Sequence, residues 1–410
     1  MFRRLHSTLL ACGLLGLAPL LPAQSWYRDS MLAPMNATTF EKEQPRGALK
    51  LGPVLVDLSA EVAFDYSDNE LLEPVGQDGS HLGATVTFDA VWRAAKVQQL
   101  KLTAELTRRE TLSGPTKSRS YLTITPGSAL RYTAYVKDIR LTPFLNLSRQ
   151  EDPLLAATVN NTDYYKQATY DAGLQVDWPL NKTTLQGMVL RGLRTTSSDI
   201  LGRQETDRTA ASLRAVHTFN PALDLGADYF VVRQDYRNGP AESSVTQNAS
   251  LFTRWSLSKV LQLKAAIGLT KLDMTRSRLL DDATGATVLF DEVELSHRLR
   301  PNLSYFLRYS ESIGDGVSTN FLRIQDLTFG PSLMLSDKLV LRFEADWQRV
   351  RESTESGETG RRRSYRGKLE WSLPGNFFLH ATYRIIHKTS NLPTRAYDQR
   401  YFELSLLKQF

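Results

Sequence analysis

From Val54 onward, apolar and polar residues alternate along the chain with a period of two. The pattern is clearest in segments 100–106, 223–231 and 339–348, where every second residue is apolar and most residues between are polar or charged. Successive side chains of a β-strand point to opposite faces. A helix would instead scatter the charges around its circumference. The alternation therefore predicts strands with one apolar face and one polar face.

The predicted strands are long and numerous. Eighteen segments can be counted, each of roughly 12–16 residues, against ~5–6 for an average strand in a soluble protein. A tilted strand needs ~9–11 residues to cross a bilayer, so each segment is long enough to span one. The segments are 54–66, 80–93, 98–110, 119–134, 138–151, 164–178, 182–196, 206–219, 222–236, 244–257, 260–273, 286–299, 302–313, 321–335, 338–352, 361–373, 376–389 and 399–410.

Short and long connections alternate between these segments. The longer loops include 152–163 and 274–285. Membrane barrels have short turns on the periplasmic side and longer loops outside, whereas a sandwich or propeller would not need this alternation. We therefore predict an all-β, transmembrane, antiparallel up-and-down β-barrel of about eighteen strands. The short joins are Lys137-Asp138, Asn220-Pro221, Ser258-Lys259, Arg300-Pro301, Ser336-Asp337 and Pro374-Gly375.

Two segments leave the strand count open. Segment 119–134 contains Pro126-Gly127, and in segment 321–335 the apolar face changes sides at Pro331. Sixteen strands is the competing count. Either number is even, which predicts that both chain termini lie on the periplasmic side.

Aromatic residues lie near the predicted strand ends, where a membrane barrel has its interfacial girdles. The alternative is ordinary β-rich packing, since aromatic residues favour strands in general. The residues are Trp92, Trp178, Trp255, Trp347 and Trp371, with Tyr66, Phe219, Tyr309 and Tyr383.

The N-terminus is typical of an export signal. Arg3 and Arg4 precede an apolar stretch, and Ala23 offers a small residue at the expected cut, so we assign 1–23 as a signal peptide. The single cysteine, Cys12, lies within it, which leaves no disulfide in the cut chain; lipidation of Cys12 is the alternative. Segment 24–53 contains three prolines and no sustained alternation, which suggests a periplasmic segment, a small plug or a disordered tail. The barrel then occupies 54–410.

Composition agrees with a barrel. Mean hydropathy is −0.31, which resembles a soluble protein, but a barrel needs apolar side chains only on its outer face. After the signal peptide no apolar run approaches the ~18 residues of a membrane helix. The chain has 50 Lys and Arg against 44 Asp and Glu, spread along its length. The one basic run, Arg361-Arg362-Arg363, is too short to predict nucleic-acid binding.

The last ten residues resemble the C-terminal assembly signal of bacterial outer-membrane proteins. That signal has a terminal aromatic residue with apolar residues at alternate positions before it, and here Phe402, Leu404, Leu406 and Phe410 fit the pattern. Lys408 departs from it, although near the interface a lysine could snorkel to water. The resemblance implies barrel-assembly machinery and outer-membrane lipid as partners.

A second resemblance is shorter. Leu51-Gly52-Pro53-Val54, the segment Phe64 to Asn69 and the segment Leu141 to Ser148 are similar to parts of the β-barrel porin-like outer-membrane proteins often linked with capsule or exopolysaccharide systems. The resemblance implies a barrel with no catalytic motif.

The residues themselves give no convincing catalytic or metal site. His81, His217, His297, His380 and His387 lie on separate predicted strands or at their ends, without metal-ligand spacing. The sequence also lacks a phosphate-binding loop and a nucleophile elbow. We therefore expect no enzyme activity, cofactor or metal. A histidine assembled with Ser or Asp across strands, as in an outer-membrane hydrolase, stays as a lesser alternative.

The polar faces carry the candidate site. A Lys or Arg on the lipid face would cost ~2–4 kcal/mol at the membrane midplane, so the charged residues should face inward. They could filter solutes in a pore or form ion pairs that stiffen the wall. Mixed signs argue against strong ion selectivity. The pore-lining candidates are Asp57, Glu61, Asp65, Asp89, Lys101, Glu105, Arg140, Asp171, Arg214, Asp228, Lys264, Arg308, Arg342, Glu344, Asp346, Arg366, Lys368 and Glu370.

Barrel size points to function, because barrels of 16–18 strands leave an aqueous channel. The leading hypothesis is passive diffusion of small hydrophilic solutes, saccharides among them. The alternative is an accessory barrel in exopolysaccharide or capsule assembly or export. The sequence leaves the solute, the pore diameter and any oligomer open.

Overall fold

The computed structural model describes residues 49–115, 120–151, 166–196, 205–237, 243–275, 284–315, 320–355 and 357–410. The predicted signal peptide, and segment 24–53 as far as residue 48, lie outside these residues. The described strands are β1 (Leu49–Leu51), β2 (Val54–Ser67), β3 (Gly79–Ala95), β4 (Gln98–Ser113), β5 (Ser120–Ile124), β6 (Ala129–Val136), β7 (Ile139–Glu151), β8 (Lys166–Leu180), β9 (Thr183–Thr196), β10 (Thr206–Asn220), β11 (Leu223–Tyr236), β12 (Ser243–Ser256), β13 (Leu261–Met274), β14 (Gly285–Arg300), β15 (Leu303–Asp315), β16 (Phe321–Ser336), β17 (Leu339–Glu352), β18 (Thr359–Leu373), β19 (Phe377–Ser390) and β20 (Tyr397–Gln409), with one short 3₁₀ helix, η2 (Pro393–Arg395).

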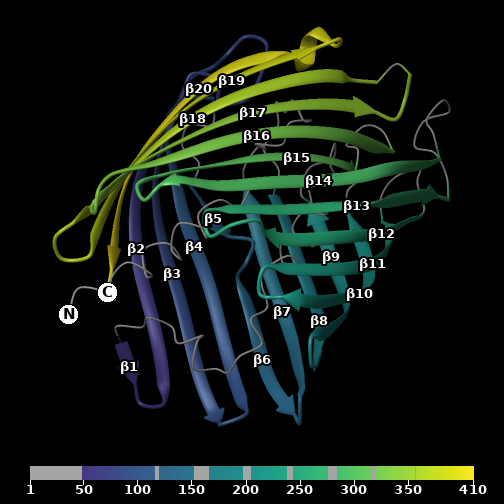
Figure 1. Cartoon of the computed structure of the whole chain (residues 1–410). Helices are drawn as coiled ribbons and strands as arrows, with labels where there is room; N and C mark the ends of the chain where they lie inside the picture. The colour runs from purple at the N-terminus through teal and green to yellow at the C-terminus, as the bar shows by residue number, and fades with distance from the viewer. Residues whose placement is uncertain are drawn as a thin grey trace.

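The strands form one closed antiparallel barrel (Figure 1). Each strand pairs with its neighbours in the chain, and β20 pairs with β2 over nine residues, from Ser59 opposite Gln409 to Ser67 opposite Tyr401. Closure of this kind leaves no exposed sheet edge, which is the condition for strands to cross a bilayer.

The barrel has eighteen spanning strands, which confirms the predicted count. β1 is a short hairpin extension that pairs only with the start of β2 among the described strands. β5 and β6 share one path across the wall between β4 and β7. They are separated at Pro126-Gly127, where Gly127 takes a φ of +114°, a conformation in which glycine carries no steric cost. The predicted segment 119–134 is therefore one interrupted strand.

The predicted change of face at Pro331 is wrong. Leu327, Phe329 and Leu335 are all exposed on the same outer face of β16, before and after the proline. The misleading residues are Leu322 and Ile324, which lie on the inner face and pack with Val350 of β17. A small apolar cluster inside the barrel thus imitates a reversed strand in the sequence.

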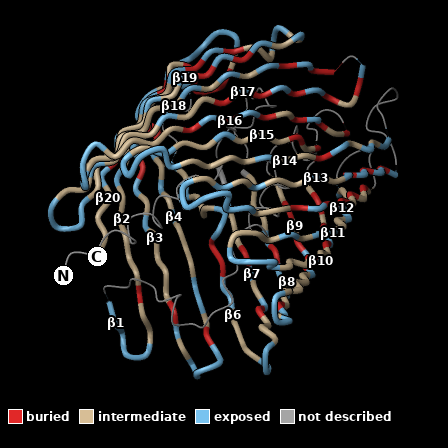
Figure 2. The backbone as a smooth tube through the Cα atoms, in the orientation of Figure 1, coloured by how far each residue is buried: buried red, intermediate tan, exposed pale blue. Residues whose placement is uncertain are grey.

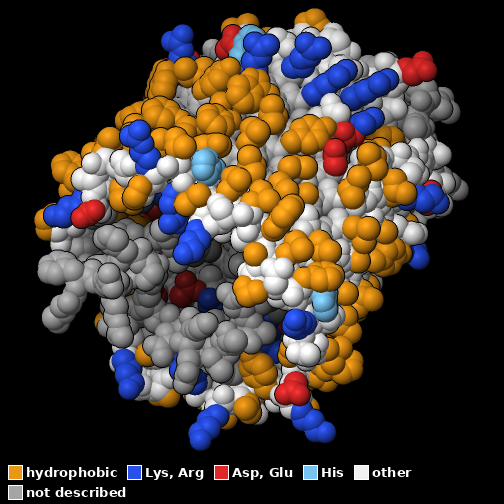
Figure 3. Space-filling view, in the orientation of Figure 1, with side chains coloured by type: hydrophobic (Ala, Val, Ile, Leu, Met, Phe, Trp, Pro, Cys, Tyr) orange, Lys and Arg blue, Asp and Glu red, His pale blue; other side chains and the backbone are white. Residues whose placement is uncertain are grey.

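The outer wall is apolar, with aromatic residues near its edges. Figure 3 shows hydrophobic side chains over much of the face in view. Trp92, Trp178, Trp255 and Trp371 are each 44–46% exposed and lie within a few residues of the strand ends that lead into short turns. Trp347 lies on the outer face nearer the opposite end. These positions are those of the two aromatic girdles of a membrane barrel.

The C-terminal residues lie as the assembly-signal pattern requires. Phe402, Leu404 and Leu406 are 37–43% exposed on the outer face of β20. The Phe410 N–H donates to the Leu58 carbonyl at 3.0 Å. Lys408, the residue that departs from the pattern, reaches the carbonyl of Gly375 in the neighbouring turn.

No helix in the described part of the chain is long and apolar enough to span a membrane.

Candidate functional site

All eighteen charged candidates lie on the inner face of the wall. On β17, for example, Phe343 and Trp347 are exposed on the outer face, whereas Asp346 and Gln348, of opposite parity, are buried. On every strand that carries a candidate, the charged residue alternates with exposed apolar residues and therefore lies on the opposite, inner face. Residues that stand opposite each other on neighbouring strands share a face, so the assignment agrees from strand to strand. What remains a proposal is that these residues line an open pore.

The inner face of β17 and β18 carries a ladder of ion pairs. Glu370 contacts both Arg342 and Lys368, each at 2.9 Å between nitrogen and oxygen. Arg366 donates to Glu344 on the opposite strand. Asp346 pairs at 3.2 Å with Arg362, a residue outside the candidates chosen from the sequence.

Similar pairs join other neighbouring strands. Arg140 on β7 contacts Asp177 on β8 at 2.9 Å. Arg214 on β10 contacts Asp228 on β11 at 2.9 Å. The amine of Lys264 lies 2.7 Å from Glu294, and that of Lys101 lies 4.0 Å from Asp89. Most of the predicted charges therefore take part in ion pairs, as the wall-stiffening alternative requires.

The ion pair between Asp171 and Arg208 crosses an intervening strand. Asp171 on β8 and Arg208 on β10 both stand opposite Gly192 of β9. The Arg208 Nε donates to Asp171 Oδ1 at 3.0 Å, and both side chains are almost fully buried. A side chain on residue 192 would occupy this space, so the glycine permits the close approach.

A few candidates lack a close ionic partner. Asp57 accepts a hydrogen bond from Gln409 at 3.4 Å, Glu105 accepts one from Thr125 at 2.8 Å, and Glu61 lies 3.8 Å from His380. Arg308 makes no ion pair within the described ranges, nor does Arg254, an inner-face residue on β12. Asp224 stands opposite Arg254 and Glu294 stands opposite Arg308 in the register, but neither carboxylate forms an ion pair with the arginine that it faces.

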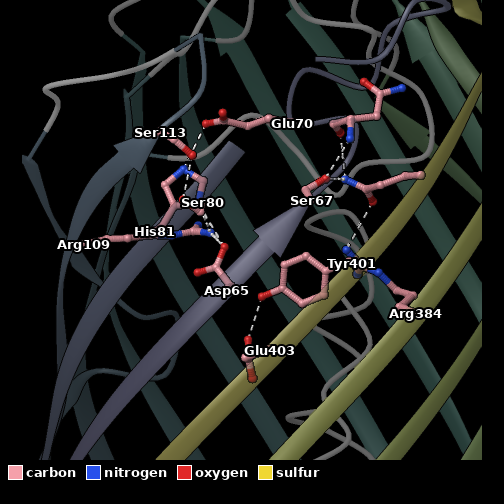
Figure 4. Close-up of polar contacts among 12 residues, drawn as sticks. Asp65, Ser67, Glu70, Ser80, His81, Arg109, Ser113, Arg384, Tyr401 and Glu403 are labelled. Atoms are coloured by element: carbon pink, nitrogen blue, oxygen red, sulfur yellow. Dashed lines mark hydrogen bonds and ion pairs between the residues drawn. The ribbon is translucent and has the colours of Figure 1, made fainter. Parts of the chain in front are cut away.

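A histidine-centred cluster holds the loop after β2, and it brings a histidine and an aspartate together across strands, as the lesser alternative from the sequence allowed. His81 Nδ1 lies 2.9 Å from Asp65 Oδ1, and His81 Nε2 lies 2.9 Å from Glu70 Oε1, with His81 only 4% exposed (Figure 4). Arg109 of β4 donates to the same Asp65 oxygen. Asp65 and His81 face each other in the β2–β3 register, but Glu70 comes from the loop, whose path the sequence does not reveal.

The geometry of this cluster disfavours a hydrolase. A catalytic histidine needs one nitrogen facing the nucleophile and the other facing its orienting acid. In His81 both nitrogens face carboxylates. The group therefore acts as a clamp between the wall and the loop.

Loop 68–78 continues from this clamp across the closure seam. The Asn69 amide nitrogen donates to the carbonyls of Glu73 at 2.7 Å and Asp398 at 2.8 Å. Gln399 of β20 donates to Ser67 and to the Asn69 carbonyl, both at 3.0 Å. We call these contacts the seam latch, because they join the first and last spanning strands.

Leu72 completes the seam latch. It packs against Ile386 and Tyr397 on the inner face of β19 and β20, and it is 4% exposed. Its φ of +56° is unfavourable for a branched side chain. Packing and the neighbouring hydrogen bonds hold the loop in this conformation.

Replacing Asn69 with alanine should release the loop while the barrel stays closed. The change removes hydrogen bonds of a buried amide, each worth about 0.5–1.5 kcal/mol. Limited proteolysis should then cut within 68–78, with the barrel still folded by its heat-modifiable migration. The matched control is Asn302→Ala, in an exposed turn with one 3.5 Å hydrogen bond, which should not change the cleavage pattern. Equal resistance of both variants would contradict the latch.

The inner wall is most covered toward the ends that carry the longer loops. Along β12, which starts at such a loop, Ser244, Thr246, Asn248 and Ser250 are 1%, 3%, 4% and 7% exposed. Figure 2 shows buried segments near the right-hand ends of the strands around β16 and β17. The inner wall is therefore covered by other side chains in this half of the barrel.

Part of this coverage comes from the corner between β15 and β16. The β14–β15 ladder stops at Glu292 opposite Ser310, while β15 continues to pair with β16 up to Asp315. Beyond that point Ile313 and Phe321 pack with Leu272 and Met274, inner-face residues of β13. The corner therefore leans inward and covers the neighbouring wall.

At the same end, an ionic cluster ties η2 to the β17–β18 loop. Arg395 contacts Glu352 at 2.7 Å and Glu358 at 3.2 Å. Burial of the Arg395 guanidinium lowers its pKa, but hydrogen bonds to the two carboxylates outweigh burial and raise the pKa above its ordinary value. Arg395 therefore stays charged and keeps both loops against the rim.

Within the described ranges, no group of three or more His, Cys, Asp or Glu residues is arranged to hold a metal ion.

No family model and no curated protein matches the chain. Solved structures do match. The Pseudomonas aeruginosa protein OpdK, solved with vanillate, is 12% identical, covers 87% of this chain and 99% of its own, and superposes with a TM-score of 0.53. OccK5 (OpdH) of the same species is 11% identical, covers 87% of this chain and 98% of its own, and superposes with a TM-score of 0.51. OccAB2 of Acinetobacter baumannii is 12% identical, covers 87% of this chain and 98% of its own, and superposes with a TM-score of 0.51. The chain therefore has the closed, eighteen-stranded antiparallel barrel fold of these outer-membrane porin structures.

Proposed function

We propose that this protein is an outer-membrane channel for passive diffusion of small hydrophilic solutes. The observation that carries the proposal is the closed eighteen-stranded barrel, apolar outside and charged inside. Barrels of this size leave an aqueous lumen unless a plug fills it. In this proposal the short turns and both termini lie in the periplasm, and the longer loops face outward.

The inner wall also supports a proposal about the solute. Most inner charges are paired, so the lumen offers solutes mainly hydrogen-bonding groups and few free charges. The inner-face groups without an ion pair among the described residues include two carboxylates, Asp57 and Glu105, as well as the arginines Arg254 and Arg308. In this proposal the two arginines favour solutes that carry a negative group. OpdK was solved with vanillate, a small carboxylate, which agrees with this preference. Neutral saccharides should pass more slowly.

Planar-bilayer recording tests the channel. The purified mature protein should give stepwise conductance across a range of KCl concentrations, and a salt gradient should give a reversal potential with a mild anion preference. The variant Arg254→Gln/Arg308→Gln should reduce that preference without abolishing conductance. Heat-denatured protein is the control. Absence of steps from folded protein would refute the channel, whereas an unchanged reversal potential would refute only the role of the two arginines.

No feature of the described residues favours an accessory role in exopolysaccharide or capsule export over a channel. The structural neighbours are likewise porins. We therefore propose the channel alone.

A further inference from the structure

The outward-facing cations near the loop ends of the strands are paired in most places. On three strands the cation has an acidic residue two positions further along, and therefore on the same face. These cation–carboxylate pairs are Arg108 with Glu110 at 2.7 Å on β4, Arg233 with Asp235 at 3.0 Å on β11, and Lys271 with Asp273 at 2.8 Å on β13.

β17 and β18 break this rule. Arg349 and Arg351 occupy the places on β17 that Arg233 and Asp235 occupy on β11, so the acid is replaced by a second arginine. The facing strand adds Arg361 and Arg363. All four are exposed, and none forms an ion pair with a described residue. We call Arg349, Arg351, Arg361 and Arg363 the arginine patch.

The register places these charges against one another. Arg349 stands directly opposite Arg361, and Arg363 stands opposite Trp347. Like charges directly opposite on one face of a sheet destabilise it. An anion bound between the two guanidinium groups would replace this repulsion with attraction of both groups to the anion. Figure 3 shows a group of Lys and Arg side chains gathered at the upper right of the wall, beyond the hydrophobic surface, where Figure 1 has the ends of these strands.

The arginine patch lies at the height of lipid headgroups. Trp371 belongs to the girdle at the short-turn end of β18, and Arg361 lies ten residues back along the strand. At ~3.4 Å per residue and a tilt of ~40°, this separation is roughly 26 Å across the membrane, close to the ~25 Å height of the apolar band. Trp347 and Tyr365, whose rings meet edge to face at 6.3 Å, lie just inside it. The guanidinium groups thus meet the first polar layer beyond the apolar band.

We propose that the arginine patch binds the phosphate groups of a phosphorylated glycolipid of the outer leaflet, such as lipid A. Guanidinium binds phosphate through paired, charge-assisted hydrogen bonds, and several adjacent arginines suit a ligand with more than one phosphate. The proposal rests on the orientation proposed above, with the longer loops outward. It gives the Arg361-Arg362-Arg363 run two roles on alternate faces: Arg361 and Arg363 meet lipid, while Arg362 pairs with Asp346 inside.

The test compares two variants that each lose four positive charges. The patch variant is Arg349→Gln/Arg351→Gln/Arg361→Gln/Arg363→Gln. The matched control, Arg108→Gln/Arg233→Gln/Arg237→Gln/Lys271→Gln, removes cations that already have carboxylate partners, including Arg237 with Asp207 at 3.0 Å. Binding of fluorescent lipid A to the full mature protein is titrated in detergent, with folding verified by heat-modifiable migration.

Each arginine near an anionic surface contributes about 1 kcal/mol, so the patch variant should weaken lipid A binding roughly 100-fold or more, and the control no more than about threefold. Lipid A without its phosphates should bind the wild type as weakly as lipid A binds the patch variant. Should the patch variant misfold, Arg349→Gln/Arg361→Gln alone should still weaken binding about tenfold.

Equal losses in both variants would overturn the proposal, as would equal binding of dephosphorylated lipid A. Competition by phosphatidylglycerol or free phosphate at the same concentration would also overturn it, because the patch would then recognise any phosphate. The patch variant should keep wild-type conductance, since its residues lie outside the lumen. Failure of the channel proposal and failure of the lipid proposal can therefore be told apart.

Discussion

Replacing Gly192 with alanine is expected to destabilise the barrel by about 1–3 kcal/mol, although the change adds a single methyl group. The new Cβ would lie 2.0 Å from Asp171 Oδ1 and 2.8 Å from Arg208 Nε. Because both side chains are buried, the shift weakens a charge-assisted hydrogen bond, Arg208 Nε to Asp171 Oδ1, that water cannot readily replace. Asp171→Ala should cost more, about 3–5 kcal/mol, because it leaves Arg208 buried and unpaired.

Denaturant unfolding in detergent, followed by tryptophan fluorescence, measures the effect. The matched control lies on the same strand: a Cβ on Gly187 would meet nothing within 4 Å, so Gly187→Ala should change the unfolding free energy by no more than about 0.5 kcal/mol. The double variant Asp171→Ala/Arg208→Ala should recover part of the loss, since neither charge is then stranded. If Gly192→Ala unfolds like Gly187→Ala, the ion pair across β9 is not formed.

Replacing Gly330 with valine is expected to reduce single-channel conductance. Gly330 of β16 stands opposite Phe306 of β15 on the inner face, and a Cβ on residue 330 would lie 2.2 Å from the ring. The nearest atoms all belong to the ring, so the phenyl group must turn away from the wall toward the lumen. We also expect a stability loss of about 1–3 kcal/mol from overpacking.

Two further variants assign the cause of that change. Gly367 stands opposite Phe343 on the outer face, and a Cβ there would lie 3.6 Å from the ring, so Gly367→Val should leave conductance unchanged. Adding Phe306→Ala to Gly330→Val should restore conductance. A reduction that persists without the phenyl ring would show that something other than its displacement narrows the lumen.

Phenylalanine opposite glycine is a repeated arrangement in this wall. Phe144 stands opposite Gly173 and Phe252 opposite Gly226, again on the inner face. In each case the ring lies over the glycine, where a Cβ would clash with it. The rings thereby cover the sheet while occupying little of the lumen. Aromatic residues are known to stabilise glycines in sheets in this way.

The alternation of apolar and polar residues was sufficient to predict the barrel, because lipid outside and water inside act on every strand alike. It placed the spanning strands and put all eighteen candidate charges on the inner face. It failed where local structure departs from a uniform wall. Leu322 and Ile324 are apolar on the inner face because they pack with Val350, and a period-two pattern cannot distinguish that from a reversed strand.

The partners of the inner charges were harder to predict. Pairs between adjacent strands, such as Arg342 with Glu370, follow once the register is known. The Asp171–Arg208 pair depends on the register of three strands together. The His81 cluster depends on Glu70, which a loop folds back against the wall. Alternation says nothing about either, since both are decided by tertiary structure.

The seam latch has a consequence for the order of folding. Gln399 donates to Ser67 across 332 positions of the chain, whereas the contacts of a hairpin join residues close in sequence. Contacts with so large a sequence separation carry a high loop-closure entropy and form late. The hairpins can therefore form early and locally, while the seam and loop 68–78 must wait for β20. The latch would then act as a kinetic lock, which stabilises the closed ring only after the last strand has arrived.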